Sequence, residues 1–314
     1  AEAVARGSQI AVADPRFSIA ASKARWWLPI RPGSDLALLL ALIHVVLKEE
    51  LYDKEFVARH AIGLDELRAG VSEKDPEWAQ FRTDIPAATI RELARELAAA
   101  KPAVLIHPGR HATWYGHDVQ RARAMAILTA LMGAWGREGG ILVPHAIPLA
   151  KAGHAPPFPT PARGPADGAG DRFPFATDGI ASGLRDATRT GLPYPIKAWI
   201  VSGTNLVKTL PAKKETLEAI DRLDLLVTLD ILPSEIVAWS DIVLPECTYL
   251  ERWDSFNAPA FRRPFVGLRA PAVPPRFESR SAFDIAHDLG HKLGLGAWFP
   301  FASQEDELRE QAKA

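Results

Sequence analysis

Cysteine is nearly absent from this sequence, since Cys247 is the only one among 314 residues. A lone cysteine excludes an intrachain disulfide and an iron–sulfur cluster held by cysteines of this chain. No run of about 18 uncharged apolar residues is present, so the sequence predicts no membrane-spanning helix. The net charge is −1, which gives no reason to expect a nucleic acid or an anionic membrane as a partner.

A G-x-G-x-x-G motif follows none of the expected strands, which disfavours a nucleotide-binding module of the nicotinamide type. No signal peptide and no initiating Met are present, and Ala1–Arg6 has the pattern of a helix that ends at Gly7. We therefore expect a fragment, or a processed or trimmed chain.

What is present is an ordinary globular composition, 47% hydrophobic and 24% charged, with enough length for two domains. Apolar spacing predicts helices at 36–51, 53–59, 65–67, 86–99, 118–132, 213–223 and 281–293. Apolar runs predict strands at 10–13, after Trp26, and at 103–106, 196–202, 223–229 and 242–244. The segments 144–195 and 256–275 are rich in Pro and fit no regular element, so 144–195 is either a functional irregular insertion or disordered.

Polar residues follow several of these strands. Asp230 ends the strand 223–229, a short helical segment opens at Pro233–Glu235, and Glu246 to Arg252 follow the strand 242–244. Ligands bind at the carboxyl ends of strands in open parallel sheets. On pattern alone, this is also an ordinary strand–helix–strand unit with solvated surface charge.

Two turns near the N-terminus have the same character. Asp14 follows the strand 10–13 and could accept hydrogen bonds from a ribose or a base edge, or could be a turn residue before a proline. The turn Gly33-Ser34-Asp35 precedes a long apolar helix, so Ser34 or Asp35 could simply be its N-cap.

The loop from Pro108 to Gly116 lies between a predicted strand and a predicted helix, where helix amides can help to bind an anion. Its basic residues are either anion-binding or ordinary surface groups. A second loop, Gly203-Thr204-Asn205, follows the strand 196–202, and Asn205 is of a type common in turns.

Two stretches of the sequence resemble those of a known protein family. "VTLD…SDIVLPECTYLERWDSFN" and "DPRF…WLPIRPGSD" resemble catalytic subunits of the molybdopterin oxidoreductase (dimethyl sulfoxide reductase) family, most of all the polysulfide, thiosulfate and arsenate reductase branch. The resemblance covers nearly the whole chain apart from 144–195 and the last dozen or so residues. It implies a molybdenum bis(molybdopterin guanine dinucleotide) cofactor.

The resemblance also assigns roles to individual residues. It implies that Gly33, Ser34 and Asp35 contact the guanine end of a dinucleotide, with Asp35 accepting from guanine N–H groups. It implies cofactor contacts for Asp14, Gly109, Asn205, Leu229, Asp230 and Arg252, the last with a phosphate. Leu206 and Leu229 depart from the family, which often has Pro and Ser there. Arg110, and after it His111, are implied to face an anionic substrate as catalytic residues. No metal ligand is predicted in this chain.

The expected fold is α/β, with two doubly wound, mostly parallel-sheet domains. The resemblance implies a discontinuous first domain, 1–100 plus 270–314, and a second domain, 101–269, with the stretch 256–275 crossing back between them. The family's N-terminal part, with its [4Fe-4S] cluster motif and metal ligand, and its C-terminal barrel are not in this sequence. The chain therefore resembles the central part of a larger subunit and is expected to be inactive alone.

The function implied is a molybdenum oxidoreductase of anaerobic respiration that acts on a sulfur or arsenic oxyanion or a polysulfide. The alternative is a non-catalytic scaffold subunit of an electron-transfer complex that keeps the fold. The implied partners are the remaining parts of the subunit, an iron–sulfur electron-transfer subunit and a membrane anchor subunit, with a periplasmic location. Cys247 is expected to be a buried small residue and not the metal ligand.

Overall fold

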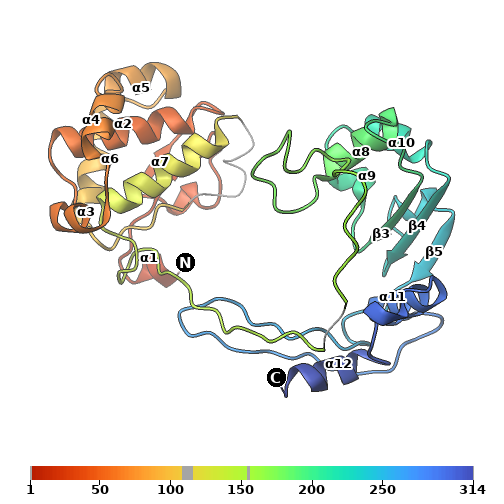
Figure 1. The fold of residues 1–314 in the computed structure, drawn as a ribbon. Coiled ribbons are helices and arrows are strands. Elements are labelled where there is room, and N and C mark those ends of the chain that lie inside the picture. The colour runs from red at the N-terminus through yellow and green to blue at the C-terminus, as the bar shows by residue number, and fades with distance from the viewer. Residues whose placement is uncertain (1, 108–115, 154–155, 314) are drawn as a thin grey trace. The chain divides into compact units, whose positions relative to one another are not determined.

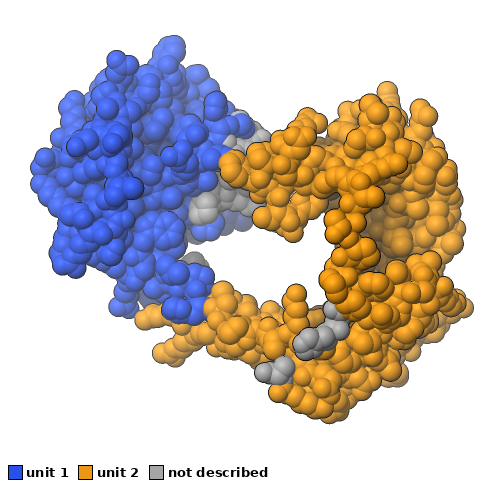
Figure 2. Space-filling model, viewed as in Figure 1, with its two compact units in different colours: residues 1–145 blue, residues 146–314 orange. Residues whose placement is uncertain are grey.

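The computed structural model describes residues 2–107, 116–153 and 156–313. The chain divides into two compact units, Ala1–His145 and Ala146–Ala314, which are coloured separately in Figure 2. This division falls at a different place from the discontinuous domains implied by the family, whose assignment stays a prediction. Each unit is described by itself below.

Unit 1 is mostly helical, with one small parallel sheet. Strands β1 (Ala11–Ala13) and β2 (Trp26–Leu28) pair in parallel, with Ala13 opposite Leu28. The other elements are α1 (Glu2–Ala5), η1 (Ala21–Lys23), α2 (Asp35–Lys48), α3 (Lys54–His60), α4 (Leu64–Val71), α5 (Pro76–Thr83), α6 (Ala87–Ala99) and α7 (Asp118–Leu131).

Helix α2 is the centre of unit 1. Ten of its residues are buried, as expected for a helix that is apolar on all sides. Helix α7 lies beside it in Figure 1, and Leu128 of α7 and Ile43 of α2 are both fully buried in the same core. Helices α2 and α7 therefore pack against each other in the core of unit 1.

Unit 2 contains a three-stranded parallel sheet in the order β3-β4-β5, formed by Ala198–Ser202, Leu225–Asp230 and Ile242–Pro245. Its other elements are α8 (Ala181–Thr190), α9 (Leu206–Thr209), α10 (Lys213–Ile220), η3 (Val237–Trp239), α11 (Ala282–Lys292), η4 (Gly296–Trp298) and α12 (Gln304–Gln311). Successive side chains of a strand point to opposite faces of the sheet. Leu226 accordingly packs with Ile220 of α10, and Val227 packs with Ile285 of α11.

Most predicted elements are confirmed, and three predictions are wrong. No strand forms at 103–106: the amides of Ala103 and Val104 donate to the carbonyls of Ala100 and Pro102, so this backbone closes local turns instead of a ladder. Within 144–195, which was predicted to be irregular throughout, α8 forms and packs on α10. Residues 233–235 are not helical, and the 3₁₀ turn η3 begins only at Val237.

Candidate functional site: the carboxyl ends of the two parallel sheets

In unit 1, the parallel pairing of β1 and β2 brings Asp14 beside the turn that follows β2. The amide of Asp14 donates to the carbonyl of Leu28 at 3.1 Å, and Trp27 Nε1 donates to the carbonyl of Asp14 at 2.9 Å. Oδ1 of Asp14 accepts from the amide of Arg16 at 2.9 Å, and this bond closes a turn that contains Pro15. Within the described residues Oδ2 accepts no hydrogen bond, so a turn role accounts for only one oxygen of this carboxylate.

The predicted Gly33-Ser34-Asp35 turn directly follows β2. Gly33 has a φ of 81°, a region that glycine enters without strain. Ser34 occupies the N-cap position of α2, yet its hydroxyl makes no cap bond and donates to the carbonyl of Arg31 at 2.6 Å. Helix capping therefore does not explain the side chain of Ser34, while Asp35 starts the helix itself.

Asp35 faces an arginine that sequence reasoning missed. Arg121 of α7 is only 2% exposed, and its Nη1 lies 3.7 Å from Oδ2 of Asp35. The arginine was missed because a charged residue in a helix is ordinarily counted as surface. A usable signal existed, since Arg121 shares the helical spacing of the buried residues Ala124, Leu128 and Leu131.

In unit 2, the loops after β3 and β5 both contact the end of the strand between them, β4. The amide of Gly203, after β3, donates to the carbonyl of Leu229 at 3.1 Å, and the amide of Glu246, after β5, donates to that of Asp230 at 3.1 Å. Gly203 has a φ of 64°, and a Cβ added there would meet no atom of the described residues within 4 Å. The backbone at this strand end is therefore open to close approach by a ligand.

Asn205 connects the loop after β3 to the segment after β4. Its Nδ2 donates to Oε2 of Glu235, which follows β4. A carboxylate can only accept, so this contact fixes which end of the amide faces Glu235. Oδ1 of Asn205 is buried and has no hydrogen-bond partner among the described residues. A buried acceptor without a donor is rare in folded proteins, so this atom indicates a donor supplied from outside the described chain.

Asp230 ends β4 with a well-satisfied carboxylate, preceded by the buried Leu229. Oδ1 accepts from the amides of Ile231 at 2.7 Å and Leu232 at 3.1 Å, and Oδ2 accepts from the hydroxyl of Ser234 at 2.8 Å. Burial by itself raises the pKa of Asp230, but the donors of Ser234, Leu232 and Ile231 outweigh burial and hold the pKa below its ordinary value.

Arg252 lies inside an ion-pair network of the chain itself. Its Nη1 donates to Oε1 of the buried Glu246, and its Nε donates to Oδ1 of Asp254 at 3.2 Å. Asp254 is also bound by Arg269. The guanidinium that was predicted to pair with a cofactor phosphate therefore has two carboxylate partners already, and it holds together the backbone that follows β5.

Three predicted residues, Gly109, Arg110 and His111, lie outside the described residues. Among the residues that are described, no group of three or more His, Cys, Asp or Glu side chains could hold a metal ion. Cys247 is 1% exposed, as expected for a buried small residue, and burial raises the pKa of its thiol.

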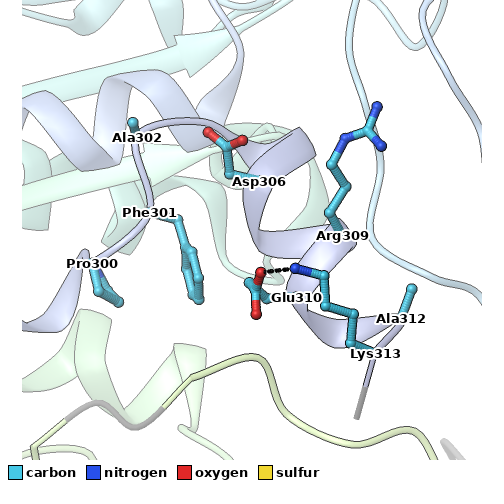
Figure 3. Close-up of a pocket in the computed structure, with 8 residues that line it drawn as sticks. All are labelled: Pro300, Phe301, Ala302, Asp306, Arg309, Glu310, Ala312 and Lys313. Atoms are coloured by element: carbon cyan, nitrogen blue, oxygen red, sulfur yellow. Dashed lines mark hydrogen bonds and ion pairs between the residues drawn. The ribbon is translucent and has the colours of Figure 1, made fainter.

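The structure also has two surface pockets, one at α12 and one beside Arg31. One, of about 700 Å³, is lined by Phe301 and by α12 residues such as Asp306 and Arg309, and the Glu310–Lys313 ion pair crosses its edge in Figure 3. The other, of about 440 Å³, includes Arg31. None of the predicted cofactor residues lines either pocket, so the strand ends and not these pockets are the candidate site.

Comparison with known proteins agrees with the strand-end geometry. The family model described as "Molybdopterin oxidoreductase" matches residues 2–292. The chain belongs to the molybdopterin oxidoreductase family. The thiosulfate reductase molybdopterin-containing subunit PhsA of Salmonella typhimurium is 36% identical over 96% of this chain and 41% of its own length.

More distant relatives share the same region. The arsenate respiratory reductase molybdopterin-containing subunit ArrA of Shewanella is 25% identical over 91% of this chain and 38% of its own length. The solved structure of acetylene hydratase from Pelobacter acetylenicus has a TM-score of 0.82 at 25% identity and covers 99% of this chain and 47% of that one. The chain is thus a mixed α/β piece of a molybdopterin oxidoreductase, and it spans about two fifths of the length of its first curated relatives.

The family implies a molybdenum bis(molybdopterin guanine dinucleotide) cofactor, and the residues at the strand ends fit its nucleotide parts. Guanine and ribose present N–H and O–H donors, for which carboxylate and amide oxygens are suitable acceptors. Asp14 and Asp35 supply such oxygens in unit 1, and Asn205 and Asp230 supply them in unit 2. No helix within the described ranges has the length and apolar character needed to cross a bilayer.

Proposed function

We propose that this chain is the central part of a catalytic subunit that binds molybdenum bis(molybdopterin guanine dinucleotide) and reduces or oxidises a sulfur or arsenic oxyanion or a polysulfide by two electrons. The observation that carries the proposal is the buried Oδ1 of Asn205, which has no hydrogen-bond partner in the part of the chain that the structure describes and lies at a strand end where Gly203 leaves the backbone open. The substrate class is supported by the likeness to thiosulfate and arsenate reductase subunits.

In this proposal the chain's own residues bind and orient. Asp14 and Asp35, with the turn at Gly33 and Ser34, take one guanine end, and Asn205 and Asp230 take donors of the second dinucleotide. The cofactor supplies the two-electron chemistry when it is bound. Arg110 offers a planar pair of donors to the anionic substrate, and His111 assists it.

The rest of the proposal concerns parts outside this sequence. The remaining N-terminal part would hold a [4Fe-4S] cluster and the metal ligand, and an iron–sulfur subunit and a membrane anchor would pass electrons at the periplasmic face. In the whole subunit, the two small parallel sheets would belong to two doubly wound domains, the first assembled from 1–100 and 270–314. A non-catalytic scaffold remains the alternative.

The test uses the full-length subunit purified without oxygen. Molybdenum and guanine nucleotide should each be present, and a reduced dye should be oxidised on addition of thiosulfate, polysulfide or arsenate. Acetylene serves as a control, since a protein of this fold is named a hydratase and its reaction consumes no electrons. A subunit without guanine nucleotide would support the scaffold alternative, and cofactor with activity on acetylene alone would overturn the substrate class.

A further inference from the structure

The buried Arg121 joins the first residue of α2, which the proposed function assigns to the cofactor, to the segment that precedes α7. Its Nη1 lies 3.7 Å from Oδ2 of Asp35, the first residue of α2. Its Nη2 donates to the carbonyl of Gly116 at 2.8 Å, two residues before the first residue of α7. The side chain is 2% exposed, whereas the Asp35 side chain is 25% exposed and so remains open to a ligand on one side.

Packing alone does not account for a charge at this place. Removing a guanidinium from water costs several kcal/mol, and an apolar side chain of similar volume is often neutral or stabilising where a buried ion pair stood. The neighbours of Arg121 along the buried face of α7 are Ala124 and Leu128, which pack without any charge. The charge is therefore explained by the groups that the guanidinium contacts, and Asp35 and Gly116 are two of these.

We propose that Arg121 is a positioning residue, which holds the carboxylate of Asp35 in the orientation that accepts the N–H donors of the cofactor's guanine. This inference rests on the proposed function, because it needs a guanine nucleotide at Asp35. The oxygen that faces Arg121 is Oδ2, and each carboxylate oxygen has two lone pairs, so the ion pair leaves acceptor sites on both oxygens.

The fork of the arginine is essential to this role. Two different nitrogens approach two segments. Nη2 donates to the carbonyl of Gly116 before α7, and Nη1 forms an ion pair with Asp35 at the start of α2, at 3.7 Å, which is longer than a hydrogen bond. A lysine has a single nitrogen at the end of a flexible chain and cannot hold both contacts in one fixed geometry. Lysine should therefore keep the attraction to Asp35 and lose part of its orientation.

The test measures guanine nucleotide retained per polypeptide after extensive dialysis of the full-length subunit, together with molybdenum content and thermal midpoint. Arg121→Met should retain roughly threefold to tenfold less nucleotide, which lies in the lower part of the coupling found between residues in contact, and Arg121→Lys should lie between it and the wild type. The Asp35→Asn variant should lose nucleotide too, and adding Arg121→Met to it should cause little further loss. The exposed Arg123→Met on the same helix is the matched control and should match the wild type.

Wild-type nucleotide retention in Arg121→Met would overturn the inference, as would losses that simply multiply in the Asp35→Asn background. If Arg121→Met does not fold, nucleotide retention in Arg121→Lys, compared with and without Asp35→Asn, tests the same inference. A wild-type subunit that lacks guanine nucleotide altogether would instead overturn the proposed function.

Discussion

The side-chain nitrogen of Asn205, Nδ2, donates a hydrogen bond to the carboxylate of Glu235, and this bond joins the loop after β3 to the segment after β4. The same bond turns Oδ1 of Asn205 away from Glu235, into a buried place where none of the described residues donates to it. The two loops therefore present an acceptor, and the ligand group that meets Asn205 should be an N–H or O–H group.

The first prediction follows from the direction of this bond. Asn205→Asp replaces the donor with a second carboxylate that faces Glu235, so repulsion should move the loop and lower cofactor content of the full-length subunit. Glu235→Gln in the same chain should restore much of the content, because glutamine can donate to the new aspartate. Cofactor content should be measured by released guanine nucleotide, and failure of the second substitution to restore it would contradict the prediction.

The second prediction concerns Gly133, at the end of α7. Its φ is 62°, and a Cβ there would lie 2.9 Å from Cγ of Asp53. Asp53 caps α3 through the amide of Phe56 and accepts from Arg137 at 2.8 Å. Gly133→Ala should therefore lower the free energy of unfolding for two reasons. The helix cap made by Asp53 is lost, which costs about 0.5–2 kcal/mol, and an alanine in the left-handed region is strained by about 1–2 kcal/mol.

Gly136→Ala is the matched control for this prediction. Gly136 has a φ of 72° and nothing within 4 Å of an added Cβ, so only the backbone strain applies. The urea midpoints of the two variants of the full-length subunit should differ, with Gly133→Ala the less stable. Adding Asp53→Ala to Gly133→Ala should lower the urea midpoint little further. Equal midpoints for Gly133→Ala and Gly136→Ala would refute the contact with Asp53.

Much of the fold could be predicted because the buried face of a helix or strand requires apolar residues at regular spacing in the sequence. The apolar spacing of α2, α6, α7 and α11 predicts those helices, and apolar runs predict the strands of unit 2. Helix α12 was missed because Leu308 is its only buried residue, which leaves no apolar face to detect. Helix α8 was missed because its buried set includes Arg185 and Thr188, and because the surrounding segment is rich in Pro and Gly.

The site could be predicted in part, for a related reason. Asp14, Asn205 and Asp230 follow strands in the sequence, so their place at a sheet edge follows from the strand assignment alone. The partners of charged groups cannot be read in this way. Arg252 is neighbour to Glu251 in sequence, yet its carboxylate partners are Glu246 and Asp254.

The third prediction concerns the reactivity of Cys247. Burial raises the pKa of its thiol, and the thiolate is the form that reacts with alkylating reagents. In the folded full-length subunit at pH 8, the peptide that contains Cys247 should stay unmodified by iodoacetamide, and urea should expose it. Mass spectrometry of that peptide makes the measurement, with any exposed cysteine of the subunit as an internal control. Rapid modification without urea would show that the segment after β5 opens on its own.

The raised pKa of Cys247 also has a defined effect on stability. The folded state binds the thiol proton more tightly than the unfolded chain, so this contribution to stability is complete below the ordinary thiol pKa, about 8.5. It decreases as the pH rises through the higher pKa of the folded state. Cys247→Ser, with a hydroxyl that does not titrate there, should lack this alkaline decrease.

The last prediction concerns the pH dependence that Asp230 confers. Its pKa is held below the ordinary value, so the folded state binds the proton less tightly than the unfolded chain does. The stabilisation is therefore complete above the unfolded pKa, about 3.9, and is lost as the pH falls through the lower folded pKa. Asp230→Asn cannot accept from Ser234 and the two amides equally well, and it should cost about 1–2 kcal/mol near pH 6. Urea midpoints of the full-length wild type and variant should converge as the pH falls below about 4, and a difference that is constant from pH 3 to pH 6 would show that the ionised carboxylate does not stabilise this strand end.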